Sequence, residues 1–588
     1  MEKWTVAGKK ADFAAWGEQF HISPVLARII RNRDVTTLQE VETFLNGDLS
    51  DCPSPFLLQD MDKAVSTIKQ AISEHIAIRV IGDYDVDGIC ASYILTKGLR
   101  LLGADVDTVI PHRVHDGYGL NDGLITQAHQ DGIGMIVTCD NGIAASKQIA
   151  LANSLGLFVV VTDHHEVPFR EEEDGTMRQL LPPALAIVDP KRQDCGYPYS
   201  EICGGLVAYK LIQAMNSVAE TKIPDAAMEE LLEFAALATV CDVMELRGEN
   251  RIIVKEGLKR MKQSSNLGLR ALMQIHQIEA DRLSTYHLGF VIGPCLNATG
   301  RLDTANRSLE LLFSSTNVEA MQSARELKEL NDSRKNLTQI GVEEAEEYIR
   351  KHGIEKDNVM VVFCPGIHES LAGIVASRLK EKYYRPVFLL TKGEEGVKGS
   401  ARSIEGYHMF HKMSEVSCLF TKFGGHAMAA GFSMEEEDVP KLRRQLNEKC
   451  GLTEEDFIAN VKIDVPMPLG YADFSLAEQL ELLEPHGVGN PKPLFAEKNV
   501  TFLSGRKLGA NANVGKYQVR TEDGKQGTLM YFGNLDNFDW YLEDKFGLGS
   551  ARTLYMGDGQ FQLAVAYHLG INEYKGKKEL QFVMQNYK

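Results

Sequence analysis

Asp83-Tyr84-Asp85-Val86-Asp87-Gly88 follows the mostly apolar segment Ile76 to Ile81, and this stretch decides the fold class. A run of β-branched residues that stops at a polar turn predicts a buried strand. Side chains alternate along an extended segment, so we expect Asp83, Asp85 and Asp87 to point to the same side. The end of one strand would then offer three carboxylates to cations. For this motif alone, a polar turn without a ligand is the alternative.

Polar motifs of the same kind follow later apolar segments. They are Thr138-Cys139-Asp140-Asn141-Gly142, Asp163-His164-His165 and Val240-Cys241-Asp242. Asp-Asn-Gly alone is ordinary turn chemistry, and Asp242 alone could simply end a helix. The carboxyl ends of parallel strands meet at one edge of a sheet, so the joint occurrence of these motifs favours a metal cluster at that edge.

The chain predicts several α/β and β-rich parts. Apolar β-rich runs alternate with helical stretches between residues 76 and 190, which predicts βαβ units and a parallel sheet. A Glu/Lys/Arg-rich pattern from Asn317 to His352 predicts a connecting helix about 50 Å long, at 1.5 Å per residue. A second, smaller α/β unit follows, and short strands after Gly451 predict a small barrel of the oligonucleotide-binding type. The expected parts are an N-terminal helical segment (1–50), a catalytic domain (51–265), a helical connector (266–345), a substrate-binding domain (346–455) and a nucleic-acid-binding barrel (456–588).

The ligand types favour manganese. Asp-x-Asp-x-Asp-Gly opens a calcium loop, but the twelfth position counted from Asp83 is Ile94 rather than Glu, so calcium is not expected. Mixed Asp and His ligation favours Mn²⁺ over Mg²⁺, although Mg²⁺ stays an alternative. Two such ions can activate water and stabilise the oxygens of a displacement at phosphorus, so phosphoester hydrolysis is the expected reaction. Cys139 and Cys241 adjoin ligand candidates, and we expect small buried residues there rather than thiolate ligands.

Composition sets limits on the function. The chain has 588 residues and a net charge of −18, which argues against non-specific coating of nucleic acid but not against a basic groove. No apolar run reaches the length of a membrane span, and the first residues lack an apolar signal core, so we expect a cytoplasmic protein. The 10 cysteines include no CxxC pair, so neither a zinc knuckle nor a disulfide framework is indicated.

These motifs resemble the DHH phosphoesterase superfamily, which is named for the triplet seen here as Asp163-His164-His165. Further motifs, from about residue 50 to the end, are similar to its RecJ branch, the single-strand-specific DNA exonucleases. They are Asn297-Ala298-Thr299-Gly300-Arg301, Gly373-Ile374-Val375-Ala376-Ser377-Arg378, Gly399-Ser400-Ala401-Arg402-Ser403, Gly424-Gly425-His426-Ala427-Met428-Ala429-Ala430-Gly431 and Pro485-His486-Gly487-Val488-Gly489-Asn490-Pro491.

The resemblance implies a fold and an activity. The parallel-sheet DHH domain would be joined by a long helix to a smaller α/β domain of the DHHA1 type, and an OB-like barrel would follow. The enzyme would degrade single-stranded DNA in the 5′→3′ direction to nucleoside 5′-monophosphates, in DNA repair and recombination. A helicase or a single-strand-binding protein would be its partner, and no membrane would be involved.

The resemblance also implies a metal set. One ion would be held by Asp87, Asp140, His164 and Asp242. The other ion would be held by Asp83, Asp85 and Asp140, so that Asp140 bridges the two. His165 would face the scissile phosphate as a donor. The implied catalytic residues are Asp140, His164 and His165.

A second implied set binds the DNA backbone. Near the 5′ phosphate it comprises Arg301, Ser400 and Arg402. Along the strand it comprises Arg378, Gly424, Gly425 and His426. An Arg fork suits phosphate, and Gly lets backbone amides approach closely. Each Arg taken singly could instead form a surface ion pair, and His426 could be a core histidine.

Two residues depart from the family pattern. Cys295 stands where the family more often has Arg, which removes one possible phosphate contact. His486 stands where an aromatic residue is more usual, which would change how the barrel packs on the core. Selectivity for single strands would come from a narrow groove and from stacking aromatics on the barrel, for which we expect Tyr517, Tyr531 and Phe532.

Two rival functions remain open from the sequence. A phosphatase, phosphodiesterase or pyrophosphatase of the same superfamily would act on small molecules, but it would leave residues 456–588 unexplained. A non-catalytic DNA-binding relative with a decayed metal site is the other rival, and the presence of every ligand candidate speaks against it.

Overall fold

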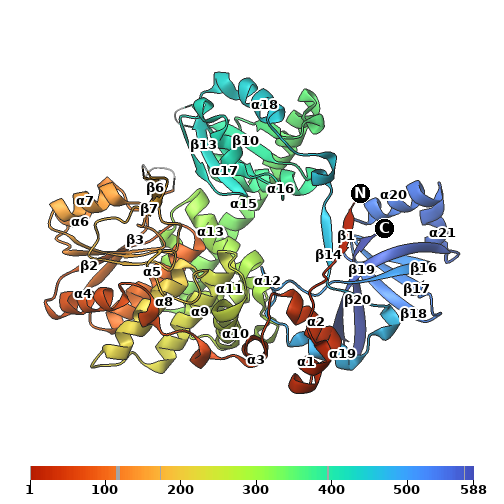
Figure 1. The fold of residues 1–588 in the computed structure, drawn as a ribbon, viewed down its shortest axis with the longest axis horizontal. Coiled ribbons are helices and arrows are strands. Elements are labelled where there is room, and N and C mark those ends of the chain that lie inside the picture. The colour runs from red at the N-terminus through yellow and green to blue at the C-terminus, as the bar shows by residue number, and fades with distance from the viewer. Residues whose placement is uncertain (1, 114–118, 173, 394–395, 575) are drawn as a thin grey trace. The chain divides into compact units, whose positions relative to one another are not determined.

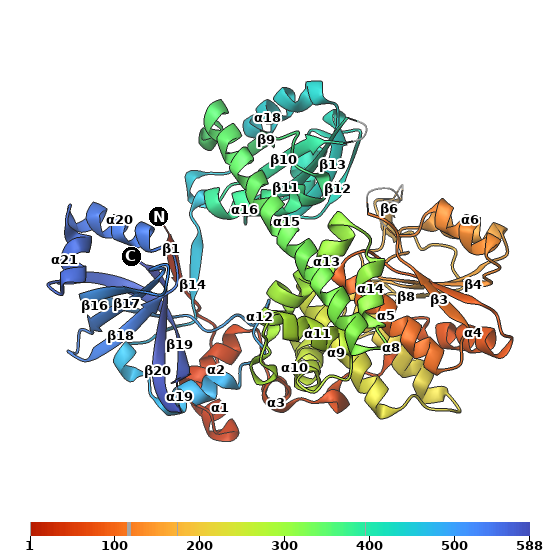
Figure 2. The same cartoon turned by 180° about the vertical axis from the view of Figure 1, so that it is seen from behind.

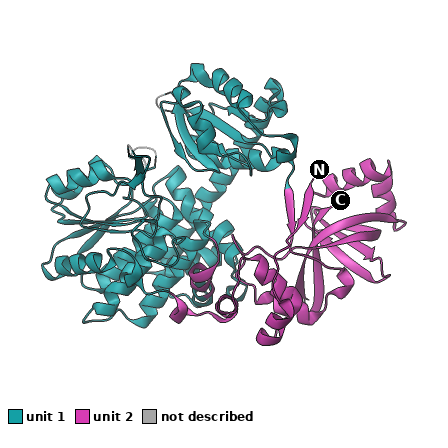
Figure 3. Cartoon of the chain, viewed as in Figure 1, with its two compact units in different colours: residues 1, 53–244, 256–459 teal, residues 2–52, 245–255, 460–588 magenta. Residues whose placement is uncertain are grey.

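The computed structural model describes residues 2–113, 119–172, 174–393, 396–574 and 576–588 (Figure 1). The chain divides into two compact units (Figure 3). Unit 1 comprises residues 53–244 and 256–459, and unit 2 comprises residues 2–52, 245–255 and 460–588. Within the described ranges, no helix is long and apolar enough to cross a membrane.

Unit 1 contains the predicted parallel sheet, with strand order β3-β2-β4-β5-β8. Figure 2 labels β3, β4 and β8 of this sheet. Its strands are β2 (Ile78–Ile81), β3 (Val106–Val109), β4 (Met135–Cys139), β5 (Phe158–Thr162) and β8 (Ala186–Val188), and each neighbouring pair is parallel. One face of the sheet contacts α5 (Val86–Leu101) and α8 (Gly204–Val218), which pack with α9 (Asp225–Cys241). The other face shares an apolar cluster with α6 (Asp122–Gln130) and α7 (Ser146–Ser154). The prediction of a parallel α/β domain is confirmed.

The expectation that the first three carboxylates share one extended segment is wrong. Asp85 is the N-cap of α5, where its carboxylate accepts a hydrogen bond from the backbone N of Gly88 at 3.1 Å, and Asp87 lies in the first turn. Asp favours N-cap positions for this reason. Gly88 permits the tight entry, because a Cβ there would lie 2.5 Å from the carbonyl oxygen of Asp83. A loop, a cap and a helix therefore supply these carboxylates.

The connecting helix α15 (Asn317–His352) has the bounds that the sequence predicts. Thr316 and Glu319 form a capping box at its start, and Gly353 ends it in the left-handed conformation at φ 63°. Near one end α15 packs against α11 (Leu267–Ile275) and α13 (Gly293–Leu302), and near the other it contacts β9 (Met360–Phe363) and α16 (Glu369–Tyr383). It joins the two lobes of unit 1.

The second lobe of unit 1 is the predicted smaller α/β unit. Its sheet has the order β12-β13-β11-β10-β9, and only β9 and β10 are parallel. The remaining strands are β10 (Val387–Lys392), β11 (Val397–Arg402), β12 (Lys422–Gly425) and β13 (Ala429–Met434). α16 packs on β10 and β11, and α18 (Val439–Glu448) contacts β9.

Unit 2 contains the predicted C-terminal barrel. β16 (Phe495–Leu508) pairs with β17 (Val514–Arg520) on one side and with β19 (Phe561–Tyr574) on the other. β18 (Gln526–Tyr531) pairs with β17 and with β20 (Lys577–Tyr587), which in turn pairs with β19. The pairings form a closed ring, and the prediction of a small OB-like barrel is confirmed.

The first residues of the chain belong to unit 2. β1 (Lys3–Val6) pairs in parallel with β14 (Asn460–Ile463), which the sequence did not predict. The helices α1 (Phe13–Phe20), α2 (Pro24–Asn32) and α3 (Leu38–Asn46) contribute to the same apolar cluster as the barrel strands. Arg33 and Asp464 form a buried ion pair at 2.6 Å between the N-terminal residues and the barrel region.

Two aromatics expected to stack on bases lie in the barrel core instead. Tyr517 is 0% exposed and Tyr531 is 8% exposed, and both rings pack on Phe538. Phe532, directly after β18, is 57% exposed. The expectation is wrong for Tyr517 and Tyr531 because the alternation of side chains along β17 and β18 turns both inward.

Candidate metal centre and phosphate pocket

A strained turn places Asp140 at the carboxyl edge of the first sheet. Asp140 follows β4 with φ 61°, a conformation that non-glycine residues rarely adopt and that marks functional sites. The Asn141 Nδ2 stabilises the turn by donating to the carbonyl oxygens of Ile81 at 3.1 Å and Cys139 at 2.9 Å. The Asp140 carboxylate is thereby held between β2 and β5.

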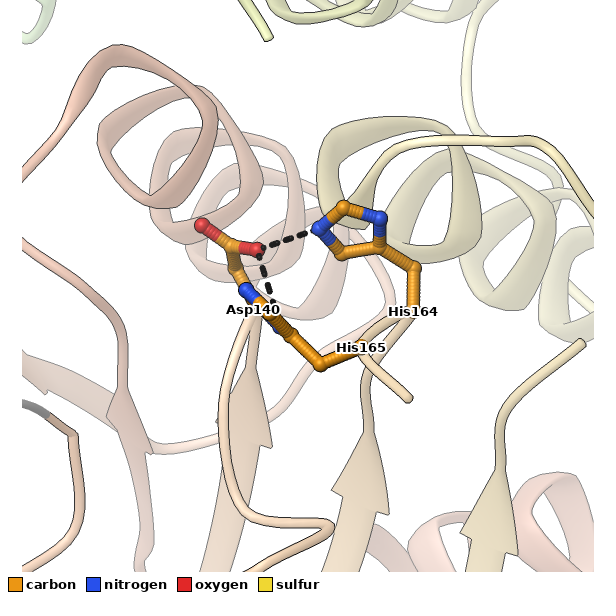
Figure 4. A group of neighbouring side chains, drawn as sticks. All are labelled: Asp140, His164 and His165. Carbon is orange, nitrogen blue, oxygen red and sulfur yellow. Dashed lines mark ion pairs between the residues drawn. The ribbon is translucent and has the colours of Figure 1, made fainter. Parts of the chain in front are cut away.

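The predicted ligands of the first ion converge on one imidazole nitrogen. His164 Nε2 lies 3.0 Å from Asp140 Oδ1, 3.5 Å from Asp87 Oδ2 and 3.8 Å from Asp242 Oδ2. Figure 4 shows the rings of His164 and His165 beside the Asp140 carboxylate, with His165 Nδ1 3.9 Å from Asp140 Oδ1. Elements far apart in the sequence thus meet at one point.

The predicted ligands of the second ion form an adjacent group. One ligand atom each of Asp83, Asp85 and Asp140 lies within 4.8 Å of the others. Asp140 belongs to both groups, which is the bridging position that the sequence analysis assigns to it. The fold therefore brings all the predicted metal ligands together.

The start of α8 supports the cluster, which the sequence analysis did not anticipate. The backbone N atoms of Gly204 and Gly205 each donate to the Asp87 carboxylate at 2.7 Å. A Cβ at Gly204 would lie 2.7 Å from Asp140 Cβ, so glycine is needed for this approach. Backbone amides at a helix start favour an anionic partner. The Gly204-Gly205 pair is the feature of the sequence from which this contact could have been predicted.

The carboxylates are crowded in a buried place. Burial first, and neighbouring aspartates second, raise the pKa of Asp83 and Asp140 well above the ordinary value and raise that of Asp242 to about 9. Among the described residues, Asp83 Oδ1 and Asp242 Oδ2 are buried and meet no hydrogen-bond donor. Carboxylates that repel one another beside one imidazole fit divalent cations, whose charge would offset the repulsion between the carboxylates.

The histidines of the triplet differ in protonation. Burial lowers the pKa of His164, which favours the neutral imidazole that binds metals. Burial also acts to lower the pKa of His165, but the hydrogen bond and charge of Asp163 outweigh it and raise the pKa to about 9. Asp163 accepts from the backbone N of both histidines and lies 2.7 Å from His165 Nδ1. Asp163 therefore orients His165 as a cation.

The neighbouring cysteines are thiols. Cys139 is fully buried, and burial raises its pKa to about 12. Burial likewise raises the pKa of Cys241, whose Sγ donates to the carbonyl oxygen of Leu288 at 3.6 Å. Within the described residues neither cysteine enters a candidate ligand group.

A pocket of about 470 Å³ lies between the two lobes of unit 1. From the predicted phosphate set, Ser400 and Gly424 line it. Arg301 reaches its edge, where Nη1 donates to the carbonyl oxygen of Ser370 at 2.6 Å. Arg402 is adjacent, because a Cβ at Gly373 would lie 2.7 Å from its Nη2 and 3.5 Å from Ser400 Oγ.

The arginines of this region are desolvated and repel one another. Burial, then the charges of Arg113 and Arg334, lower the pKa of Arg301 to about 9. Burial, then the charge of Arg113, lowers the pKa of Arg402. Buried cations in such surroundings fit an anionic ligand such as a phosphate.

Arg378 lies apart from the phosphate pocket. It lines a second cavity of about 390 Å³ with Arg334 and Lys335 of α15. Gly425 and His426 are exposed at the turn between β12 and β13, where the His426 backbone N donates to the Ala429 carbonyl oxygen at 2.8 Å. His426 is therefore not a core histidine.

Several lining residues escaped the sequence analysis. Arg113 stacks over the Tyr84 ring at 4.6 Å, and both line the phosphate pocket. Lys398 and Lys422 also line it. Tyr84 lies inside the first carboxylate motif, but no motif marks Arg113 or the lysines, so only the fold reveals them.

The two departures from the family pattern are accommodated locally. The Cys295 Sγ lies 3.2 Å from His276 Nε2 and 3.3 Å from Asn331 Nδ2, inside the contact between α11, α13 and α15. In unit 2, burial lowers the pKa of His486 to about 4, so this side chain is neutral.

The parallel sheet with its acidic and imidazole edge defines a metal-dependent phosphoesterase of the DHH class. Family models match in chain order: "DHH family, N-terminal domain" at residues 77–239, "DHHA1 domain" at 356–451 and "RecJ OB domain" at 463–586. The chain belongs to the RecJ family of single-stranded-DNA-specific exonucleases.

Relatives support this membership over most of the chain. The single-stranded-DNA-specific exonuclease RecJ of Escherichia coli (strain K12) is 32% identical over 96% of this chain and 96% of its own length. RecJ of Bacillus subtilis (strain 168) is 37% identical over 86% of this chain, and the match spans 62% of that protein. The crystal structure of RecJ from Thermus thermophilus in complex with Mn²⁺ superposes with a TM-score of 0.81 and 27% identity, covering 100% of this chain and 79% of that one.

Proposed function

We propose that this chain is a metal-dependent exonuclease that removes nucleoside 5′-monophosphates from the 5′ end of single-stranded DNA. The observation that carries the proposal is the convergence of the aspartates and His164 at one sheet edge, with His164 Nε2 3.0 Å from Asp140 Oδ1. A basic pocket in the same unit supplies a place for the terminal phosphate. Relatives that are 32% and 37% identical to this chain are named as single-stranded-DNA-specific exonucleases.

The two ligand groups would hold two divalent cations, with Mn²⁺ preferred. Solved relatives contain Mn²⁺ or Mg²⁺. The imidazole of His164 favours Mn²⁺ over Mg²⁺, and the shared Asp140 favours a pair of ions over one. When bound, the cations lower the pKa of water and stabilise charge on the phosphoryl oxygens.

The side chains of the protein orient the strand and move a proton. Asp87 and Asp242 lie 3.5 Å and 3.8 Å from His164 Nε2 and would share a cation with it, and the α8 amides orient Asp87 by hydrogen bonds. His165, fixed through Nδ1 by Asp163, presents its other nitrogen and donates a proton to the leaving oxygen. Arg301 and Arg402 neutralise the 5′ phosphate, which places the first phosphodiester at the metal centre and sets the 5′→3′ direction.

The biological setting belongs to the same proposal. The substrate is single-stranded DNA produced during repair and recombination in the cytoplasm, and a helicase or a single-strand-binding protein would supply it. Single strands would be selected by a site between the lobes of unit 1 that is too narrow for a duplex. The barrel of unit 2 would add affinity for longer strands.

Product length analysis tests the proposal. Single strands with a 5′ phosphate and a blocked 3′ end are incubated with Mn²⁺, and the products are resolved over time. We expect mononucleotides from the first time point and a strand that shortens from its 5′ end. Products that begin at the 3′ end, or a ladder from internal cuts, would overturn it. Hydrolysis of a cyclic dinucleotide or pyrophosphate at a higher rate than the oligonucleotide would favour the small-molecule rival.

A further inference from the structure

An exposed pair of aromatic rings lies on unit 1, on a segment that packs against α9, the helix whose C-cap is Asp242. Tyr286 is 62% exposed and Phe290 is 71% exposed. Their rings stack, with centroids 5.4 Å apart and an interplanar angle of 26°. Large apolar rings are costly to leave in water, so an exposed and already parallel pair indicates a ligand with a flat face.

The helical turn that carries the rings is anchored from within. Tyr286 belongs to the short helix α12 (Thr285–His287), and Phe290 belongs to the π-helix η4 (Leu288–Ile292). Leu288 and Ile292 are fully buried, so the inward side of the turn is fixed while the rings point out. π-helical turns are rare and are frequently found at functional sites.

The buried side of this turn contacts the residue that precedes the proposed metal ligand Asp242. The carbonyl oxygen of Leu288 accepts from Cys241 Sγ at 3.6 Å, and Cys241 directly precedes Asp242. A Cβ at Gly293 would lie 2.5 Å from Cys241 Sγ, so the end of α9 and the π-helical turn are in close contact. Val243, next to Asp242, is a further exposed apolar residue at the end of α9, at 64% exposure and φ 62°.

We propose that Tyr286 and Phe290 form a stacking platform for a base of the single strand whose 5′ end occupies the metal centre. This inference rests on the proposed function and adds a base subsite to it. A strand held at the cluster carries bases with two flat faces, and base–aromatic stacking tolerates any sequence. The platform replaces the stacking role that the buried Tyr517 and Tyr531 cannot perform. Paired bases of a duplex would not be free to stack there.

The test combines side-chain removal with base removal. Oligothymidylates with a 5′ phosphate carry one abasic residue, moved stepwise from the 5′ end. For the wild type, we expect an abasic residue at one position to raise KM about 10-fold. Phe290→Ala should raise KM for the intact strand about 10-fold and abolish the penalty at that position, with kcat unchanged. Tyr286→Ala should act in the same direction.

Matched variants separate stacking from folding. Phe290→Tyr and Tyr286→Phe keep a ring and should retain wild-type KM, whereas Phe290→Leu keeps apolar bulk and should behave as Phe290→Ala. Phe158→Ala removes an exposed ring from the amino end of β5, opposite the ligands, and should change nothing. An abasic penalty that persists in Phe290→Ala and Tyr286→Ala would overturn the platform.

A binding measurement separates this inference from the proposed function. A 2-aminopurine base at the sensitive position should lose fluorescence on binding to the wild type and not to Phe290→Ala, without any turnover. A strand that binds in this way but is not degraded would contradict the exonuclease and leave the platform standing. A strand that is degraded with equal KM by both proteins would contradict the platform alone.

Discussion

The candidate metal centre and the phosphate pocket of unit 1 both contain excess charge. The charge is negative at the carboxylates of the first and positive at the arginines of the second. At Asp140, burial first and the neighbouring aspartates second raise the pKa of the carboxylate. Around Arg301, burial first and the charges of Arg113 and Arg334 second lower the pKa of the Arg301 guanidinium. Each region is thus shaped for a ligand of the opposite charge, cations in the first and phosphate in the second.

The two regions differ in how they are built. The candidate metal centre uses Asp and His side chains at strand ends and helix ends, so each proposed ligand has little freedom once the fold forms. The phosphate pocket uses long arginines and lysines from separate elements, which can adjust. Substitutions in the metal centre should therefore abolish the chemistry, whereas substitutions in the pocket should weaken binding and positioning.

The largest effect is expected for Asp140→Asn. Asn tolerates the positive φ of this position, so the backbone turn should survive while the bridging charge is lost. We expect kcat with Mn²⁺ to fall on the order of 10³-fold, because several kcal/mol of charge stabilisation depend on the ligand set. Release of labelled nucleotide measures the change.

The same variant should stabilise the metal-free protein. Removing one carboxylate from the buried group weakens the repulsion among those that remain. Thermal unfolding in the presence of a chelator should therefore move to a higher temperature in Asp140→Asn. The exposed Asp105, at the other edge of the sheet, gives the control Asp105→Asn, which should change neither kcat nor Tm. A lower Tm for chelated Asp140→Asn would show that the carboxylates are not in conflict.

Asp163→Asn should have the next largest effect. The Asp163 carboxylate orients His165 and is not itself in a candidate ligand group of the described residues. Loss of such a supporting contact costs about 10-fold to 100-fold. We expect that loss in kcat, with a smaller change in the Mn²⁺ concentration at half-maximal rate. An equal change in kcat and in the Mn²⁺ concentration at half-maximal rate would instead show that Asp163 is a metal ligand.

Arg402→Gln should affect recognition of the strand end. A hydrogen bond to a charged group is worth about 1.5–3 kcal/mol, so kcat/KM for a 5′-phosphorylated strand should fall about 30-fold. A strand with a 5′ hydroxyl should be affected much less, because it lacks the charge that Arg402 neutralises. Equal losses of kcat/KM on both strands would show that Arg402 does not recognise the 5′ phosphate.

The smallest effect is expected for Arg334→Gln, in the cavity shared with Arg378. Each lost phosphate contact should lower the slope of log K against log salt by about 0.7 for a single strand. Arg350→Gln removes the same charge from an exposed position of α15 and should leave the slope unchanged. Equal slopes in the wild type and in Arg334→Gln would show that the strand does not bind in this cavity.

Much of the metal centre was predictable because its ligands sit in short motifs directly after apolar segments. The parallel sheet then brings strand ends together whatever lies between them. The path of the chain at Asp85 was not predictable from alternation, since the N-cap preference of Asp starts α5 two residues after Asp83 rather than extending the strand.

The parts that escaped prediction depend on contacts between distant segments. The pairing of β1 with β14 joins the first residues of unit 2 to the start of its last segment (460–588), and no local pattern encodes it. Arg113 and Arg334 lie outside any recognisable motif, and only the fold shows that their charges act on Arg301. The inward direction of Tyr517 depends on the register of the closed barrel, which a list of aromatics does not give.

Crystals of the wild-type protein grown with MnCl₂ would locate the cations through their anomalous scattering. The account predicts one manganese peak among Asp87, Asp140, His164 and Asp242 and a second among Asp83, Asp85 and Asp140. Clear density for these side chains with no manganese between them, at a concentration that supports nuclease activity, would contradict it.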